Sequence, residues 1–327
     1  MAEIVLGLAT SHSPQLNTGP EWWPSHAERD KANPRLFDAH GVIHRYDDLV
    51  ERAPASMADE ITVERWRERY DACQVGIARL SEKLAEVNPD VVIVVGDDQE
   101  EIFGHDNFPA MAVYWGDTVK SIPRKPVPNA AWSAANWAYG EVERDHPVDS
   151  DLALHLIQSL MQDEFDIAHC RMLPEGMGIG HAWGFVWRRL MEPHGLEIPV
   201  IPVLLNTYYP PNQPSPKRTW DLGSAIGKAV AGWESDARVA VLASGGLSHF
   251  VVLEDLDRAF LKALATKDAD AVRSMPAPVL NAGTSEIRNW IAMAAAVDHL
   301  SMDLVDYVPC YRSPAGTGCA MGFAIWE

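Results

Sequence analysis

Histidine and acidic side chains that directly follow short apolar runs are the residues of this chain with the clearest chemical potential. His12 comes just after the apolar run 4–9, and the polar run 97–101 (Asp-Asp-Gln-Glu-Glu) follows the apolar run 91–95. Apolar runs of this length that end in turn residues predict buried strands. Since α/β sheets bind ligands outside the carboxyl ends of their strands, we expect these polar side chains to meet at one edge of a sheet.

Two further histidines are carried on glycine-rich segments. The apolar run 239–243 leads into Ser244-Gly245-Gly246-Leu247-Ser248-His249. His181 directly follows the glycine-rich run 176–180. The glycines permit a tight turn and a close backbone approach, which would present His249 to a cavity. The GxSxG pattern of a nucleophile elbow is absent, which disfavours a Ser-His-Asp hydrolase. The spacing before His181 matches a dinucleotide-binding loop only loosely, so a nucleotide site is not expected there.

The composition is that of an ordinary soluble globular protein, with 327 residues, 47% hydrophobic and 22% charged residues. A formal net charge of −19 argues against nucleic acid and anionic membrane surfaces as partners. No apolar run approaches the roughly 18 residues that span a bilayer. The N-terminus has no signal-peptide pattern, so we expect a cytoplasmic protein. The four cysteines are scattered without CxxC spacing, as expected of reduced core residues.

The order of the expected elements favours one α/β domain over residues 1–327, with a mostly parallel or mixed central sheet flanked by helices and an active site at the strand ends. Apolar spacing predicts a helix over 63–87, which Asn88-Pro89 would end, between the strands at 4–9 and 91–95. The polar segment 17–60 reads as an inserted, lid-like segment with little regular structure. Further strands are expected at 109–115, 198–205 and 318–326, and further helices at 151–163, 219–231, 254–266 and 285–297.

Taken in order along the chain, these motifs resemble one family, the class III extradiol ring-cleavage dioxygenases, typified by the β-subunit of protocatechuate 4,5-dioxygenase and including the methylgallate type. The resemblance covers nearly the whole chain. The matching motifs are Thr10-Ser11-His12-Ser13-Pro14, the strand end 91–98, Asp163-Glu164-Phe165-Asp166 leading to Gly180-His181, Asn206-Thr207-Tyr208-Tyr209-Pro210-Pro211, Ser244-Gly245-Gly246-Leu247-Ser248-His249, Gly283-Thr284-Ser285-Glu286 before Trp290, and Pro314-Ala315-Gly316-Thr317.

This resemblance implies an oxidoreductase that cleaves a catecholic or gallate-type aromatic acid with O2 in the extradiol (meta) manner. The implied cofactor is a non-haem Fe(II) held by two histidines and one carboxylate. His12 matches the first histidine ligand and Glu286 matches the carboxylate. His249 matches the base that takes a proton from the substrate, and His181 matches a second histidine of the catalytic pocket.

The family's second ligating histidine falls at a position where this chain has Gln99. A neutral amide oxygen is a weaker ligand for Fe(II) than an imidazole. Three alternatives follow: Gln99 binds the metal, a histidine from elsewhere (His40, His44 or His105) replaces it, or the site no longer holds catalytic iron. A metal-dependent hydrolase on the same scaffold, or a non-catalytic binding relative, is the corresponding alternative function.

The substrate's carboxylate requires a donor. The resemblance suggests Thr317 and Tyr208 for substrate binding, and Lys217, Arg218 and Arg312 are candidate cations. An exposed approach to a helix explains Lys217 and Arg218 equally well. We expect a homodimer, and a separate small subunit stays open as a further partner.

Overall fold

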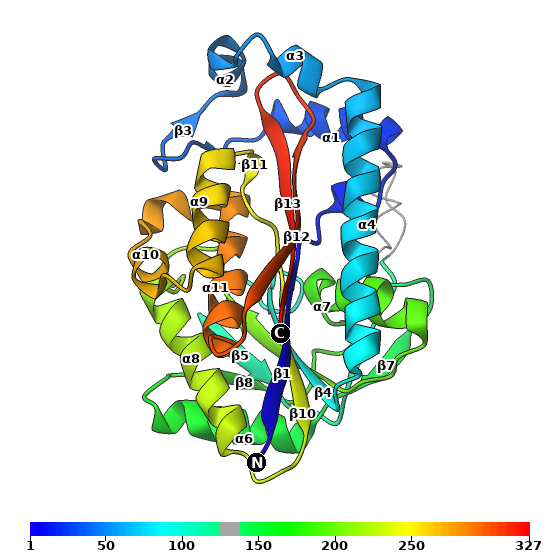
Figure 1. Cartoon of the computed structure of the whole chain (residues 1–327), viewed down its shortest axis with the longest axis vertical. Helices are drawn as coiled ribbons and strands as arrows, with labels where there is room; N and C mark the ends of the chain where they lie inside the picture. The colour runs from blue at the N-terminus through cyan, green and yellow to red at the C-terminus, as the bar shows by residue number, and fades with distance from the viewer. Residues whose placement is uncertain (125–137) are drawn as a thin grey trace.

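A mixed sheet of nine strands lies at the centre of the computed structural model, which describes residues 1–124 and 138–327 (Figure 1). The strand order is β11-β13-β1-β10-β4-β9-β5-β8, and β12 pairs with β13. The strands are β1 (Glu3–Thr10), β4 (Val91–Asp97), β5 (Met111–Tyr114), β8 (Ala168–Cys170), β9 (Val200–Leu205), β10 (Arg238–Ser244), β11 (His249–Val251), β12 (Met302–Tyr311) and β13 (Thr317–Trp326). The expected single α/β domain with a mixed sheet and flanking helices is confirmed.

The four central strands β1, β10, β4 and β9 run parallel, as the sequence predicts. Thr10 at the end of β1 is opposite Ser244 at the end of β10, and Asp97 at the end of β4 is opposite Leu205 at the end of β9. The polar segments that follow these strands therefore leave the sheet at one edge.

Helix α4 (Val63–Val87) has the predicted bounds and covers one face of the sheet. The Thr62 hydroxyl accepts from the Arg65 N–H at its start, and Asn88 ends it in the left-handed conformation at φ 44°. The opposite face is covered by α8 (Pro216–Gly232), α9 (Glu254–Ala265) and α11 (Ile287–Ala296) (Figure 1). Within residues 1–124 and 138–327, the remaining α-helices outside segment 17–60 are α6 (Ser150–Gln162), α7 (His181–Val186) and α10 (Ala269–Arg273).

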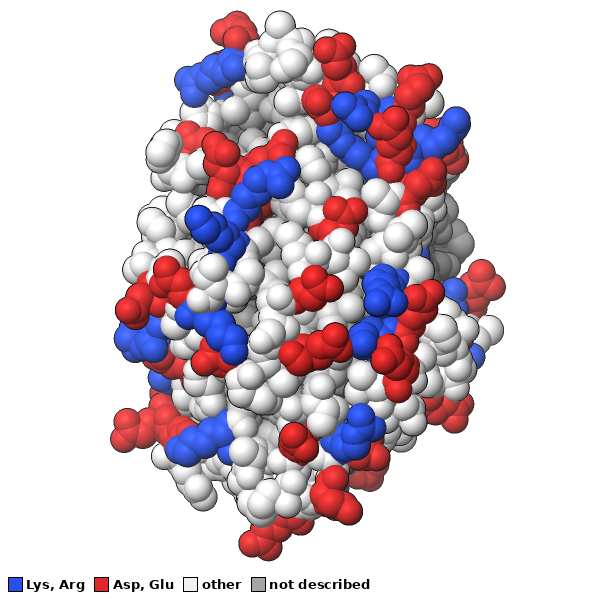
Figure 2. Space-filling model, viewed as in Figure 1, with Lys and Arg blue, Asp and Glu red and all other residues white. Residues whose placement is uncertain are grey.

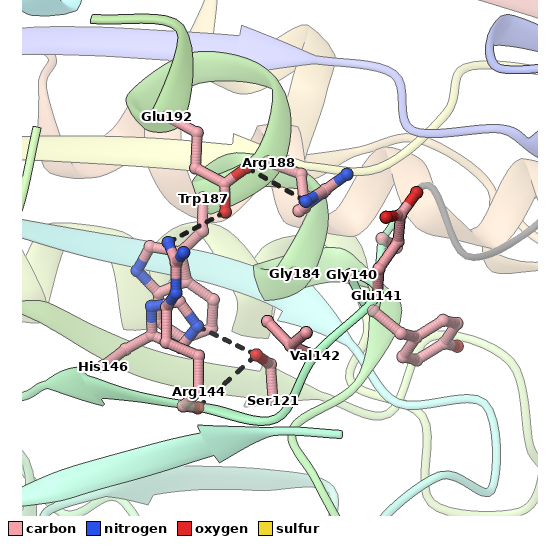
Figure 3. Close-up of a pocket in the computed structure, with 12 residues that line it drawn as sticks. Ser121, Gly140, Glu141, Val142, Arg144, His146, Gly184, Trp187, Arg188 and Glu192 are labelled. Atoms are coloured by element: carbon pink, nitrogen blue, oxygen red, sulfur yellow. Dashed lines mark hydrogen bonds and ion pairs between the residues drawn. The ribbon is translucent and has the colours of Figure 1, made fainter. Parts of the chain in front are cut away.

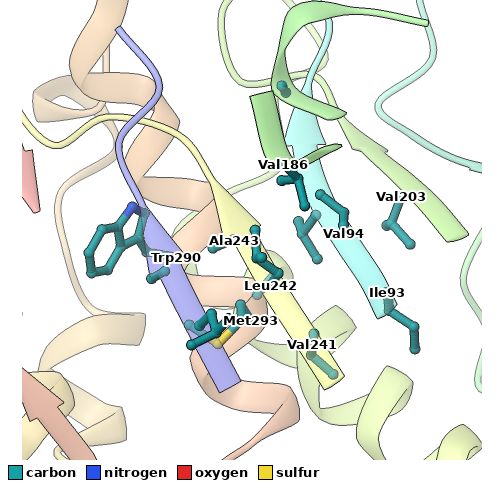
Figure 4. Packing of buried hydrophobic residues seen from close by; sticks show 14 of the residues in the cluster. Ile93, Val94, Val186, Val203, Val241, Leu242, Ala243, Trp290 and Met293 are labelled. Atoms are coloured by element: carbon teal, nitrogen blue, oxygen red, sulfur yellow. The ribbon is translucent and has the colours of Figure 1, made fainter. Parts of the chain in front are cut away.

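The hydrophobic core lies between these layers. Figure 4 shows Trp290 and Met293 of α11 in the same buried core as Val241 and Leu242 of β10. All ten residues of α11 are buried, and the two polar ones, Arg288 and Asn289, have hydrogen-bond partners there. This complete burial fixes α11 against the sheet, and with α11 the residues at its N-terminal end.

Segment 17–60 contains more regular structure than the sequence predicts. It holds α1 (Trp23–Asp30), the hairpin of β2 (Leu36–Phe37) and β3 (Ile43–His44), α2 (Tyr46–Arg52) and α3 (Met57–Glu60). Elements of two to eight residues are too short to show a hydrophobic period, which is why the expectation of little regular structure is wrong. In Figure 1 these elements cap the molecule beside the turn that joins β12 to β13.

Strand β12 is absent from the sequence expectations. It contains Asp303, Asp306 and Pro309, residues that are typical of loops. Because β12 pairs only with β13, it is an edge strand, where a proline is tolerated. A second small sheet, β6 (Thr118–Ser121) with β7 (Arg144–Pro147), was also not expected.

Acidic and basic side chains are interspersed on the face shown in Figure 2, with no region of one sign. Among the described residues, no helix combines the length and the hydropathy that crossing a membrane requires.

A buried ion pair ties segment 17–60 to the β12–β13 turn. Arg312 donates from Nε and Nη2 to the two carboxylate oxygens of Asp30, at 2.8 Å each. Asp30 also accepts from the Thr317 hydroxyl at 2.5 Å, and Arg312 donates to the Gln15 amide oxygen at 3.0 Å. Asp30 is 2% exposed and Arg312 7% exposed, so either side chain alone would be a buried, unpaired charge.

Replacing Arg312 with methionine should therefore lower the free energy of unfolding by about 3–5 kcal/mol, because Asp30 stays buried without its partner. The measurement is urea unfolding followed by tryptophan fluorescence. Asp30→Asn combined with Arg312→Met should cost less than Arg312→Met alone. Arg65→Met, which breaks an exposed pair with Glu68, is the control and should cost about 1 kcal/mol or less. A loss no larger for Arg312→Met than for this control would contradict the assignment.

Candidate metal centre and active site

The carboxylate of Glu286 lies at the centre of the candidate site. Glu286 is 2% exposed and occupies the last position of a short 3-10 turn, directly before α11. Its Oε2 accepts from the Gly246 N–H at 2.6 Å, and its Oε1 accepts from the Gln99 amide at 3.1 Å. Two ring nitrogens also face it: His12 Nε2 at 3.3 Å and His249 Nε2 at 3.2 Å. The three strand ends that the sequence singles out thus meet at one carboxylate.

The hydrogen bonds of His12 define which ring nitrogen faces the cluster. The Ser244 hydroxyl donates to the Ala182 carbonyl at 2.7 Å, so its oxygen accepts from His12 Nδ1–H at 2.9 Å. In the neutral ring Nε2 then carries the lone pair, and this atom faces Glu286 and the Nε2 of His181, 3.1 Å away. A histidine whose second nitrogen donates to a neighbouring acceptor is the arrangement that metal-binding histidines adopt.

His181 is held by Glu101 in the same manner. His181 opens α7, and its Nδ1 is 2.6 Å from Glu101 Oε2, while its backbone N–H also donates to that carboxylate. Glu101 in turn accepts from the Tyr139 hydroxyl and from Arg124. Asp98 accepts from the backbone N–H groups of residues 101–103 and so shapes the loop that presents Glu101.

His249 follows the same pattern. Its Nδ1 donates to the Leu247 carbonyl at 2.8 Å, which leaves Nε2 toward Glu286. The ring is enclosed by two glycines, because a Cβ on Gly283 would lie 1.9 Å from His249 Cδ2 and a Cβ on Gly246 would lie 2.7 Å from its Cε1. The Thr284 hydroxyl, which donates to the His249 carbonyl at 3.0 Å, also holds this residue in place.

Gln99 turns its amide NH2 toward two carboxylates. Gln99 Nε2 donates to Glu286 Oε1 at 3.1 Å and to Asp97 Oδ2 at 3.3 Å. Asn289 donates to Asp97 Oδ1 at 3.0 Å, so both oxygens of this fully buried acid are held. Gln99 itself is exposed. Gln99, the residue that departs from the family pattern, therefore lies at the cluster, and its NH2 group faces Asp97 and Glu286.

The cluster concentrates negative charge away from solvent. Burial lowers the pKa of His249, but the Glu286 carboxylate outweighs burial and raises that pKa to about 10. Burial likewise lowers the pKa of His181, and Glu101 raises it to about 9. Burial raises the pKa of Glu286, but His249 and His12 hold it well below its usual value. Burial and the Glu286 charge raise the pKa of Asp97. Carboxylates surrounded by imidazoles in this way favour a bound cation.

The donor set fits a divalent transition metal. His12, Asp97 and His181 can each offer one ligand atom within 4.8 Å of the others, and Glu286 contacts His12. Neutral His12 and His181 would direct two lone pairs at each other across 3.1 Å, an unfavourable contact that a proton or a metal ion between them relieves. Imidazole and carboxylate ligands suit iron, zinc and related metals.

Two residues of this cluster, Asp97 and Glu101, were not assigned a role from the sequence. Both lie in the acidic run 97–101, and the sequence marks this run as a candidate for chemistry. The sequence does not show that the members of the run face different partners. Asn289 gives no sequence signal, because an asparagine inside an apolar helix shows its function only through its contact with Asp97.

The three alternative histidines lie elsewhere. His44 contacts Asp38 at 2.7 Å and Arg52 at 3.1 Å, and His40 is exposed. The His105 side chain is 76% exposed and pairs with Glu100. Among the described residues, His181 is the additional histidine that faces His12.

The three residues expected to bind substrate, Tyr208, Thr317 and Arg218, have contacts in different parts of the fold. Tyr208 is half-buried; burial and the charge of Glu286 raise the pKa of its phenol, while the Arg35 guanidinium over its ring lowers that pKa. Thr317 is fully buried and donates to Asp30 in the ion-pair network. Arg218 lies 3.8 Å over the Phe165 ring and donates to the Glu164 carbonyl, so its contacts are with the end of α6.

A small pocket next to α7 is lined by none of the expected site residues. It encloses about 20 Å³, room for about one water molecule, beside Trp187 and His146, whose rings stack at 3.8 Å (Figure 3). Arg144 and Arg188 on its wall both pair with Glu192. Its two arginines are already paired and its volume is small, so it is too small for an aromatic substrate.

Comparison with known proteins agrees with this geometry. A sequence model described as the catalytic LigB subunit of aromatic ring-opening dioxygenase matches residues 62–317. The chain is 28% identical over 167 residues to a 2,3-dihydroxyphenylpropionate/2,3-dihydroxicinnamic acid 1,2-dioxygenase of Paraburkholderia xenovorans (strain LB400), covering 51% of this chain and 45% of that protein. It is 27% identical over 187 residues to a gallate dioxygenase of Pseudomonas putida (strain KT2440), covering 53% of each.

The matched region thus spans about half the length of these curated relatives. The family match is longer. It includes α4, most of the central sheet, His181, His249 and Glu286. On that match, this chain belongs to the family of the catalytic LigB subunits of aromatic ring-opening dioxygenases.

Proposed function

We propose that this protein is a non-haem Fe(II) dioxygenase that opens the ring of a dihydroxylated aromatic acid in the extradiol manner. The observation that carries the proposal is the convergence of His12, His181 and His249, through their Nε2 atoms, on the buried Glu286 carboxylate and its neighbours. The family membership and relatives named for dihydroxyphenylpropionate and gallate support the same chemistry.

Two histidines and one carboxylate from this cluster would hold the iron: His12, Glu286 and a third residue. The resemblance described from the sequence puts Gln99 at the third position, as one of three alternatives. The contacts favour His181, because the NH2 of Gln99 is engaged by Glu286 and Asp97, whereas the Nε2 of His181 faces His12. In this proposal Gln99 and Asn289 hold the carboxylates in position. Bound iron would supply the redox chemistry between the dihydroxylated ring and O2.

His249 is proposed as the base that accepts a proton from a substrate hydroxyl. Its Nδ1–H is committed to the Leu247 carbonyl, so Nε2 is the position that would accept a proton once a cation bound at Glu286 offsets the charge that raises the His249 pKa to about 10. The contact between Nε2 and Glu286 stabilises the imidazolium that forms. Gly246 and Gly283 enclose the ring and so hold it in one orientation.

Iron loading and oxygen uptake test the proposed function directly. Protein reconstituted with Fe(II) without oxygen should bind iron in equimolar amount, and then consume O2 with protocatechuate, gallate or 2,3-dihydroxyphenylpropionate while a yellow ring-opened product appears. Iron that binds without O2 uptake on any of these acids would contradict the proposed class of substrate. Oxygen-independent hydrolysis by zinc-loaded protein would instead support the hydrolase alternative.

Glu101→Gln tests whether His181 is a ligand. Removing the carboxylate that orients a ligating histidine typically lowers metal affinity by about 10- to 100-fold. We expect a loss of that size in competition with a chelator, with thermal unfolding followed in parallel. Glu100→Gln, an exposed neighbour paired with His105, is the matched control. If Gln99→Ala weakens the metal while Glu101→Gln leaves it unchanged, Gln99 is the third ligand.

Gly283→Ala tests the role of His249. The added methyl group would lie 1.9 Å from His249 Cδ2, so the ring must move away from its place. We expect kcat to fall by about 100-fold, as for a catalytic group displaced by about 1 Å, with iron content retained. Gly232→Ala, where an added Cβ meets open space, should leave kcat unchanged. A Gly283→Ala enzyme with wild-type kcat would exclude His249 as the base in this orientation.

A further inference from the structure

The cations that the sequence offers for an anionic substrate are already engaged in other contacts. Lys217 pairs with Asp221 at 2.6 Å, Arg218 lies on Phe165, and Arg312 is bound to Asp30. Arg124 pairs with Glu101 at 2.7 Å. Arg288 is buried and donates to four backbone carbonyls, those of Pro214, Thr207, Leu280 and Ser285.

Arg35 differs from all of these. Its guanidinium lies over the ring of Tyr208, with Cζ 4.7 Å from the ring centroid. Within residues 1–124 and 138–327 no carboxylate lies at ion-pair distance from it. Stacking uses the face of the guanidinium and leaves its edge, with the planar fork of N–H donors, available to an anion. A half-buried arginine without an acidic partner is unusual in a chain of net charge −19.

The place of Arg35 in the fold brings it to the candidate site. Arg35 directly precedes β2, which packs against β11, the strand that begins at His249. Leu36 of β2 is fully buried, so this end of segment 17–60 is anchored to the body of the protein. Its stacking partner Tyr208 follows the carboxyl end of β9, and the charge of Glu286 acts on the Tyr208 phenol. Arg35 therefore lies between the strand of His249 and the loop after β9.

We propose that Arg35, supported by the ring of Tyr208, is the specificity-determining residue that binds the carboxylate of the aromatic substrate. The guanidinium edge would donate two parallel N–H···O bonds to the carboxylate, while the dihydroxylated end of the ring faces His12, His249 and Glu286. A neutral catechol offers no partner for this guanidinium. The enzyme then selects aromatic acids over neutral catechols through a residue of segment 17–60. This inference rests on the proposed function for the identity of the substrate.

Arg35→Met keeps much of the apolar side chain and removes the charge and the donors. The probe is whichever of protocatechuate, gallate and 2,3-dihydroxyphenylpropionate the iron-loaded wild type binds most tightly, compared with catechol. Calorimetric titration without oxygen measures binding alone, since no ring can be opened. Loss of charge-assisted hydrogen bonds should weaken binding of the acid by about 10- to 100-fold, and binding of catechol should change by less than about 3-fold.

Arg45→Met is the matched control, because Arg45 lies in the same segment and its side chain is 80% exposed. It should leave both affinities at the wild-type value, and Arg35→Lys, which keeps the charge without the planar fork, should fall between wild type and Arg35→Met. An Arg35→Met protein that still prefers the acid, or a wild type that binds acid and catechol equally, would overturn the proposal. Tight binding without ring opening in air would instead contradict the proposed function and leave the assignment of Arg35 standing.

Discussion

The buried carboxylate of Glu286 is the constraint on which the rest of the site depends. An ionised carboxylate removed from water costs several kcal/mol unless donors or positive charges surround it. Here those partners come from separate parts of the chain: His12 follows β1, Gln99 follows β4, and Gly246 and His249 follow β10. They meet only because these strands are parallel neighbours whose ends coincide. The site can therefore form only if the strands of the sheet pair in this register.

The position of Glu286 depends in turn on the packing of α11. This helix approaches α8 so closely that a Cβ on Gly223 would lie 2.0 Å from the Ala292 carbonyl, and a Cβ on Gly227 would lie 2.7 Å from the Ala296 carbonyl. Glycine at these two positions lets the helices come together, and the small residues of α11 fill the contact. The N-terminal end of α11 then points Glu286 at the strand ends, where the helix dipole favours a negative charge. Packing far from the cluster therefore sets the place of its central acid.

Much of this arrangement could be predicted from the sequence, because its signals are local. Apolar runs ended by His12, Gln99 and His249 indicated the parallel strands and their common edge. The contact between His181 and Glu101 could not be predicted, since it joins residues 80 positions apart and one acid of the 97–101 run looks like another. The donor direction of the Gln99 amide is likewise a property of the assembled site. Thr317 was suggested by its match to the family's motif and Arg218 by its charge, yet local partners, the Asp30 carboxylate and the Phe165 ring, engage them.

The residues proposed for chemistry and the residue proposed for recognition lie in two regions with different structural surroundings. Every residue of the metal cluster is buried in or against the sheet, or bonded to one that is, so a change at any position disturbs several others. Segment 17–60, which like His12 precedes the residues that match the family, is made of short elements joined by loops. It remains fixed to the body of the protein through Asp30 and Arg312 and through β2 against β11. A segment anchored in this way is well placed to carry the contact proposed to distinguish aromatic acids from neutral catechols, while the strand ends carry the proposed chemistry.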